Sequence, residues 1–115
     1  MSMKLNTRQV DGVTILDLSG RIAIGYGDVV LREAVRNALE EGAKKILLNL
    51  GDISYIDSSG IGALVGAYTM VNNQGGQLKL LNVTQKVYDL LQITQLITVF
   101  EIFDDEASAV ASFSK

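Results

Sequence analysis

Hydrophobic and polar residues alternate along the chain with two different periods, which separate predicted strands from predicted helices. Residues 5–18 alternate at strand spacing, and Asp11-Gly12 in the middle supplies the positive backbone angles that a tight hairpin turn requires. We therefore predict two antiparallel strands here. Residues 20–24 are predicted to begin a third strand, after which Gly25, Tyr26 and Gly27 loosen the chain into a loop.

The first predicted helix covers residues 29–41, because its apolar residues recur at helical spacing. Asp28 is placed to cap the start of this helix, and Gly42 is placed to end it in the left-handed conformation. The apolar stripe of the helix consists of Leu31, Ala34, Val35, Ala38 and Leu39.

A nearly unbroken apolar run at residues 46–50 is typical of a strand that is covered on both faces. We expect this strand to be parallel to its neighbours and central in the sheet, although Asn49 interrupts the run near its end. Residues 51–56 are predicted to form a loop. Helical spacing then resumes and continues to about residue 73, shortly before Gly75-Gly76 stop the helix.

The rest of the chain repeats the alternation of strand and helix. It predicts a strand at residues 78–83, a helix that Thr84 starts, a strand at residues 97–102 and a last helix. The charges of Asp104, Asp105 and Glu106 suit the start of that last helix. The whole pattern predicts one α/β domain over residues 1–115, with an N-terminal antiparallel hairpin, a mixed sheet of about four to five strands and about four helices.

The chain contains no cysteine and no histidine, which removes whole classes of chemistry. Disulfides, thiolate and imidazole metal sites, a cysteine nucleophile and a Ser-His-Asp triad are all excluded. The sequence also has no nucleotide-binding loop and no calcium loop. We therefore expect a protein that is not an enzyme and that needs neither a cofactor nor a metal.

The charge and hydropathy of the chain argue against nucleic acid and membranes as partners. A formal net charge of −3, with lysine and arginine scattered, gives no basic surface for nucleic acid. The sequence has no apolar stretch of about 18 residues and no apolar run near its start that would fit a signal peptide. We expect no membrane segment, and the cytoplasm as the location.

The segment Asp57-Ser58-Ser59-Gly60-Ile61-Gly62 places two hydroxyls beside a carboxylate where a strand gives way to a helix. In α/β domains, ligands gather where strand ends meet helix starts. Backbone N–H groups at a helix start favour an added phosphate, so Ser58 or Ser59 is a candidate phosphoacceptor. A phosphate there should release a partner and leave the fold intact, because burying it without a cation is costly.

The same residues also fit two structural explanations. Asp, Ser and Gly at a helix start are ordinary capping residues. Gly60, Gly62 and Gly66 each cost about 1 kcal/mol relative to alanine inside a helix, which indicates a close approach by the sheet or by another protein. The residues by themselves leave these explanations open.

Taken in order, the hairpin, the helix, the apolar run at residues 46–50 and the segment at residues 57–62 resemble the anti-sigma factor antagonists. These proteins share the STAS domain, which is found also in stressosome proteins and anion transporters. The likeness extends over nearly the whole chain, from the hairpin to the last acidic helix.

The resemblance implies a bacterial regulator that binds an anti-sigma factor serine kinase when unphosphorylated, so that the sigma factor is set free. Phosphorylation by that kinase would switch the protein off, and a phosphatase would restore it. Ser58 matches the family's phosphoacceptor, with Ser59 as the neighbouring alternative. Asp57 would orient the hydroxyl or contact the kinase, and Gly60 would let the partner approach. The implied partner surface is Asp57, Ser58, Ser59, Gly60, Ile61 and Gly62.

The chain departs from the family pattern after the predicted second strand. Many members have an acidic residue there, near the partner-binding face, whereas this chain has Ile22-Ala23-Ile24-Gly25. This departure leaves open a different kinase as the partner. Two other functions also stay open. One is a structural or adaptor STAS domain in a larger assembly, and the other is an anion or nucleotide site, which the lack of any basic residue from Gly51 to Thr69 disfavours.

Overall fold

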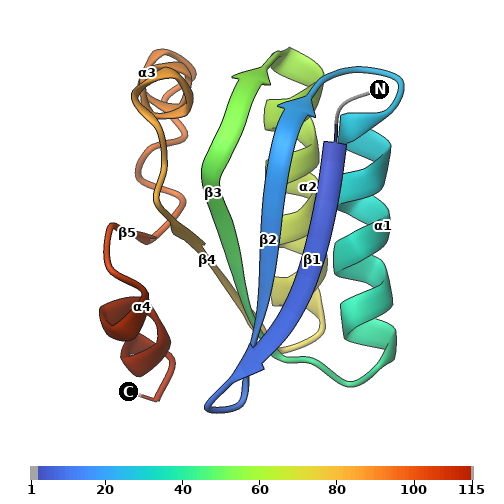
Figure 1. Cartoon of the computed structure of the whole chain (residues 1–115), viewed down its shortest axis with the longest axis vertical. Helices are drawn as coiled ribbons and strands as arrows, with labels where there is room; N and C mark the ends of the chain where they lie inside the picture. Colours follow the sequence, from blue (N-terminus) through green and yellow to red (C-terminus); the bar gives the residue numbers. More distant parts are fainter. Residues whose placement is uncertain (1–2, 115) are drawn as a thin grey trace.

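The computed structural model describes residues 3–114, which form five strands and four helices (Figure 1). The strands are β1 (Met3–Val10), β2 (Val13–Ile22), β3 (Lys45–Ile56), β4 (Gln77–Leu81) and β5 (Ile102–Phe103). The helices are α1 (Gly27–Glu40), α2 (Ser58–Asn73), α3 (Gln85–Ile93) and α4 (Glu106–Ser112).

The strands form one sheet in the order β1-β2-β3-β4-β5. β1 is antiparallel to β2, and every later pair of neighbours is parallel. The predicted class, an α/β fold with a mixed sheet led by an antiparallel hairpin, is confirmed, as is the central, parallel position of the apolar run in β3.

The hairpin turn lies where the sequence predicts it, with positive φ at Asp11 (51°) and Gly12 (82°). The predicted third strand at residues 20–24 is wrong, because these residues continue β2 as far as Ile22. Two register shifts between β2 and β3, on either side of Gly20, keep the strands paired to the end. β2 therefore stays paired with β3 as far as Ile56, the last residue of β3.

The predicted loop at residues 51–56 is also wrong, because it forms the second half of β3. Ile53 and Ile56 are buried in this half, while Asp52 and Ser54 are exposed, so the strand is covered on one face only. Only β2 pairs with this half, since the pairing of β3 with β4 ends at Asn49. The ends of β2 and β3 therefore project beyond β4.

The sheet separates two apolar cores, built from alternate residues of its strands. The larger core lies against α1, α2 and α3 and includes Leu16, Leu18, Leu31, Ile46, Leu48, Leu64 and Val87. The smaller core lies under α4 and consists of Val13, Ile15, Leu47, Leu81, Ala109, Val110 and Phe113. Among residues 3–114, no helix is long and apolar enough to cross a bilayer.

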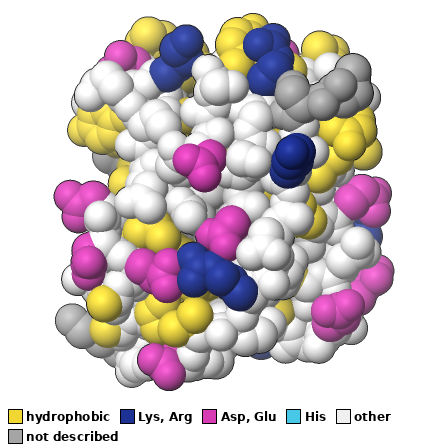
Figure 2. All heavy atoms as spheres, viewed as in Figure 1, with side chains coloured by type: hydrophobic (Ala, Val, Ile, Leu, Met, Phe, Trp, Pro, Cys, Tyr) yellow, Lys and Arg dark blue, Asp and Glu magenta, His cyan; other side chains and the backbone are white. Residues whose placement is uncertain are grey.

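Beside α4, much of the second face of the sheet is uncovered in Figure 1, and Figure 2 shows that this face is largely polar. A chain of hydrogen bonds crosses it from β1 to the end of β4. Arg8 donates to Asp17, Asn49 Nδ2 donates to Asp17 Oδ1 (2.8 Å), and Asn82 Nδ2 donates to Asn49 Oδ1 (3.3 Å). This network explains why a polar residue interrupts the apolar run of β3.

Two element ends differ from the sequence-based expectation. Asp28 does not cap α1, because the helix begins at Gly27, two residues before the predicted start. The Asp28 carboxylate lies buried within the first turn, where it accepts from the Val29 N–H (2.8 Å). The predicted strand at residues 97–102 is reduced to β5. Residues before it form turns that bury Phe100 edge-on against Tyr68, with ring centroids 5.3 Å apart.

Candidate functional site

Asp57 connects β3 to α2 and caps the helix. Its backbone is extended, and its Oδ1 accepts a hydrogen bond from the Gly60 N–H at 2.9 Å. This bond satisfies one of the N–H groups that a helix start leaves without a backbone partner. The capping explanation therefore holds for the carboxylate of the segment.

The second carboxylate oxygen of Asp57 binds a different part of the chain. Oδ2 accepts from the backbone N–H of Ile24 at 3.1 Å, in the loop between β2 and α1. Hydrogen bonds from the Gly60 N–H first and the Ile24 N–H second lower the pKa of Asp57 below its ordinary value, because both stabilise the anion. One ionised side chain thus fixes the loop beside the start of α2.

Ser58 is the first residue of α2, and its side chain is exposed. Ser59 follows it and is half-buried. An enzyme that modifies a hydroxyl must reach it, so Ser58 meets this requirement better than Ser59.

Gly60 and Ile61, two of the six residues expected on the partner surface, face the interior. A Cβ at Gly60 would lie 2.1 Å from the carbonyl oxygen of Ile22, and the side chain of Ile61 is buried. The close approach that Gly60 permits is therefore made by β2 of the same chain. Gly62 is exposed, and a Cβ at this position would have no atom within 4 Å, so the backbone of α2 is accessible here.

Three exposed apolar residues, absent from the expected surface, lie in and just after the loop that Asp57 holds. We call Ile24, Tyr26 and Val29 the apolar loop; their exposed fractions are 73%, 45% and 46%. Large apolar side chains gathered on a surface are typical of a contact site. The sequence contains a signal for this exposed surface, because Ile24 and Tyr26 alternate with glycines and belong to no predicted apolar stripe.

A cation borders the same end of the sheet. Arg21 near the end of β2 stacks its guanidinium 4.1 Å from the ring centre of Tyr55, its register partner on β3. Within residues 3–114, acidic side chains form no cluster that would hold a metal ion. The site is thus an exposed surface that combines a hydroxyl, an apolar loop and a cation.

The STAS domain family model matches residues 4–109 of this chain. The anti-sigma-B factor antagonist of Bacillus subtilis is 35% identical over 102 residues, which cover 89% of this chain and 92% of that protein. The family match spans the hairpin, the candidate site and most of the later elements.

Solved structures agree with these matches. A Thermotoga maritima protein, described as a candidate anti-sigma factor antagonist, has a TM-score of 0.88 at 27% identity, with 96% of this chain and 95% of that chain covered. The anti-sigma factor antagonist SpoIIAA in its unphosphorylated form has a TM-score of 0.77 at 23% identity and 93% coverage of both chains. Bacillus SpoIIAA in its phosphorylated form has 0.72 at 21%, covering 96% of this chain and 98% of that chain. At 23% and 21% identity the likeness shows the fold alone.

Proposed function

Because the chain belongs to the STAS domain family and groups with the anti-sigma factor antagonists, we propose that it is itself such an antagonist. In this proposal the unphosphorylated protein binds an anti-sigma factor serine kinase in the bacterial cytoplasm and thereby frees a sigma factor. The kinase phosphorylates Ser58 and ends the interaction, and a phosphatase reverses the modification. The protein itself is a binding module and performs no catalysis.

The observation that carries the proposal is the exposed hydroxyl of Ser58 beside the apolar loop. Asp57 links the two directly, because it caps the helix that Ser58 begins and holds the backbone of Ile24. A partner that covers the apolar loop therefore also covers Ser58. Ile24 of the apolar loop lies in the region, residues 22–25, where many family members carry an acidic residue, so we expect the facing surface of this kinase to be apolar.

A phosphate on Ser58 acts mainly on the interface. The helix start favours the anion by about 0.3–1 kcal/mol, and the neighbouring Asp57 opposes it, so the fold is little affected. Against a partner, an unpaired phosphate costs several kcal/mol to desolvate, which corresponds to a loss of affinity of about a thousandfold. The fold of this chain is similar to that of SpoIIAA both without and with its phosphate, which supports the expectation that this fold can carry a phosphate without rearranging.

Mass spectrometry after incubation of the protein with the cognate kinase and ATP tests the phosphoacceptor. We expect one phosphate on Ser58, and none after Ser58→Ala; Ser59→Ala serves as the matched control and should leave the modification unchanged. Modification at neither serine rejects the proposal.

A binding titration with the same kinase tests the interface mechanism. We expect Ser58→Ala to bind like the unmodified protein and Ser58→Asp to bind more weakly by at least about tenfold. Ser59→Asp is the control for added charge, because Ser59 is half-buried beside the same helix start. Equal affinity of Ser58→Ala and Ser58→Asp contradicts the mechanism.

The capping role of Asp57 supports one rival function, an adaptor in a larger assembly. In that case the segment only begins a helix, and phosphorylation is incidental. Light scattering that shows a stable large assembly, with Ser58→Ala and Ser58→Asp alike, favours the adaptor.

A further inference from the structure

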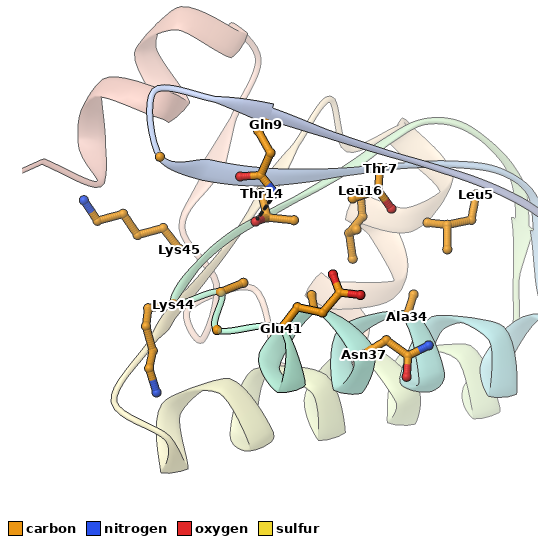
Figure 3. Close-up of a pocket in the computed structure, with 14 residues that line it drawn as sticks. Leu5, Thr7, Gln9, Thr14, Leu16, Ala34, Asn37, Glu41, Lys44 and Lys45 are labelled. Atoms are coloured by element: carbon orange, nitrogen blue, oxygen red, sulfur yellow. Dashed lines mark hydrogen bonds between the residues drawn. The ribbon is translucent and has the colours of Figure 1, made fainter.

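The groove between β1 and α1 lies away from Ser58 and has its own recognition chemistry (Figure 3). We propose that it binds an extended segment of a partner protein. The segment pairs with the free edge of β1 and places a basic side chain against Glu41. This site is independent of the function proposed for Ser58.

The first support is the free edge of β1. β1 is the first strand of the sheet, and its register with β2 runs without a bulge from Met3 to Val10. The two-residue turn makes Val10 and Val13 a pair that exchanges backbone hydrogen bonds, and such pairs alternate along an antiparallel hairpin with pairs that do not. In the second kind of pair, the backbone N–H and C=O of the β1 residue point away from β2. These β1 residues include Leu5, Thr7 and Gln9. The hydrogen bonds found outside helices and strands in residues 3–114 include none to these groups. Such an edge is a template for an added strand.

The second support is the groove itself, which has a volume of about 670 Å³. Figure 3 shows Leu5, Thr7 and Leu16 directed from the hairpin toward α1, with Ala34 directed back at them. Leu5 is 41% exposed, although its neighbours Leu16 and Ala34 are buried. Side chains of a strand added to β1 would alternate in direction, so every second one would enter this groove.

The third support is the charge along the groove. Glu41 raises its carboxylate from the end of α1 toward the hairpin (Figure 3), and within residues 3–114 it takes part in none of the ion pairs. Lys44 and Lys45 also line the groove, but in the described part of the chain neither pairs with Glu41. Lys44 donates to the Gln74 carbonyl at 2.7 Å, and the side chain of Lys45 extends away from Glu41 (Figure 3). A lysine or arginine of the occupant would complement this carboxylate.

The same charge argues against a second copy of the chain as the occupant. If β1 of another copy paired antiparallel with this edge, its groove-facing side chains would include those of Leu5, Thr7 and Gln9. None of these is basic, and Lys4 and Arg8 would face the other side of the sheet. Glu41 would then stay without a partner, so a segment of a different protein fits better.

Two synthetic peptides of alternating valine and threonine test the proposal. One has a lysine at a single groove-facing position and the other has a glutamate there. We expect NMR titration of the isotope-labelled full chain to show that the lysine peptide binds about tenfold tighter. Its binding should shift the amide signals of Leu5, Thr7 and Gln9 and slow their hydrogen exchange. Absence of effects at these three amides overturns the proposal.

Variants separate the groove from general attraction to an acidic protein. Glu41→Lys should reverse the preference between the two peptides, whereas Glu40→Lys, on the neighbouring exposed residue, should not. Thr7→Pro removes a backbone N–H that points away from β2 and is not used by the hairpin, so it should weaken binding of the lysine peptide about tenfold. Thr7→Val keeps this N–H and should bind the peptide like the parent protein. If Glu41→Lys leaves the preference for the lysine peptide unchanged, the proposal is contradicted. It is also contradicted if the protein dimerises with increasing concentration and hydrogen exchange at the same amides slows without any peptide. Ser58→Asp should leave peptide binding unaltered.

Discussion

Arg8 on β1 and Glu106 at the start of α4 are joined by two hydrogen bonds, the shorter with 2.6 Å between Arg8 Nη2 and Glu106 Oε1, although 98 positions separate them in the chain. The same guanidinium also binds Asp17 on β2, with 2.6 Å from Arg8 Nε to Asp17 Oδ2. One side chain thus ties the hairpin at the start of the chain to the last helix. α4 is only 7 residues long and depends on such contacts, because a helix of this length is not stable alone.

Replacing Arg8 with methionine should lower the free energy of unfolding by about 1 kcal/mol, or roughly 3–6 °C in melting temperature. The figure is modest because the side chain is 36% exposed and solvent screens its ion pairs. Urea denaturation measures the change. Arg36→Met is the control, since among residues 3–114 Arg36 forms an ion pair only with Glu33 on the same helix, and it should change stability by less than about 0.5 kcal/mol.

The Arg8 network should also make stability depend on pH in the acid range. Hydrogen bonds from Arg8 lower the pKa of Asp17 and of Glu106 below their ordinary values of 3.8 and 4.5. A carboxyl with a lowered pKa in the folded state stabilises the fold above its unfolded pKa, and this contribution is lost as the pH falls through the folded pKa. Urea titrations from pH 7 to about pH 2 should therefore show the difference between the parent protein and Arg8→Met shrinking below about pH 4.5. A constant difference contradicts the assignment.

Gly60 and Gly62 lie two residues apart in α2 and should respond oppositely to alanine. A Cβ at Gly60 would meet the Ile22 carbonyl oxygen at 2.1 Å, so Gly60→Ala should cost about 3 kcal/mol or more. No atom lies within 4 Å of a Cβ at Gly62, so Gly62→Ala should stabilise the protein by about 0.5–1 kcal/mol through helix propensity. Chemical denaturation of both variants gives the result, and equal effects would contradict the packing described.

Asp57→Ala should affect stability and kinase binding together. The variant loses a helix cap, which costs about 1 kcal/mol, and it releases the Ile24 backbone from the start of α2. Asp105→Ala is the matched control, because Asp105 caps α4 in the same way, with 2.8 Å to Ser108 N, far along the chain from Ser58. Asp105→Ala should lose similar stability and bind the kinase normally, as calorimetry and a binding titration can measure.

Ile24→Ser should weaken kinase binding by about tenfold and leave stability nearly unchanged, because the side chain is 73% exposed. Ile93→Ser, at the end of α3, is a close control with a side chain that is 77% exposed. If both variants bind the kinase equally, the apolar loop is not part of the interface.

The sequence predicted most of the fold because its apolar periods are regular and its turns rest on glycine. Asp11-Gly12 marked the hairpin, and Gly42, which has a φ of 97°, marked the end of α1. Errors arose where pairing between distant strands decides the structure. Residues 51–56 look like a loop because they begin with the turn residues Gly51-Asp52, and because Ile53 and Ile56 are three positions apart and do not alternate at strand spacing. They become strand because β2 lies alongside them and a register shift accommodates the extra residue.

The candidate site was predicted in part. The position and exposure of Ser58 follow from a hydroxyl at a helix start, which local sequence reveals. The bond from Ile24 to Asp57 spans 33 positions, and no local pattern predicts such a contact. Gly60 was ambiguous for the same reason, because only the folded chain shows that Ile22 occupies the space beside it.

The ends of β2 and β3 extend beyond β4, and the residues proposed to contact a kinase come directly after these two ends. Ile24 and Ser58 are exposed there, and neither belongs to the buried cores on the two faces of the sheet. In the proposed function, substitutions at these exposed positions change kinase recognition and leave the buried cores undisturbed.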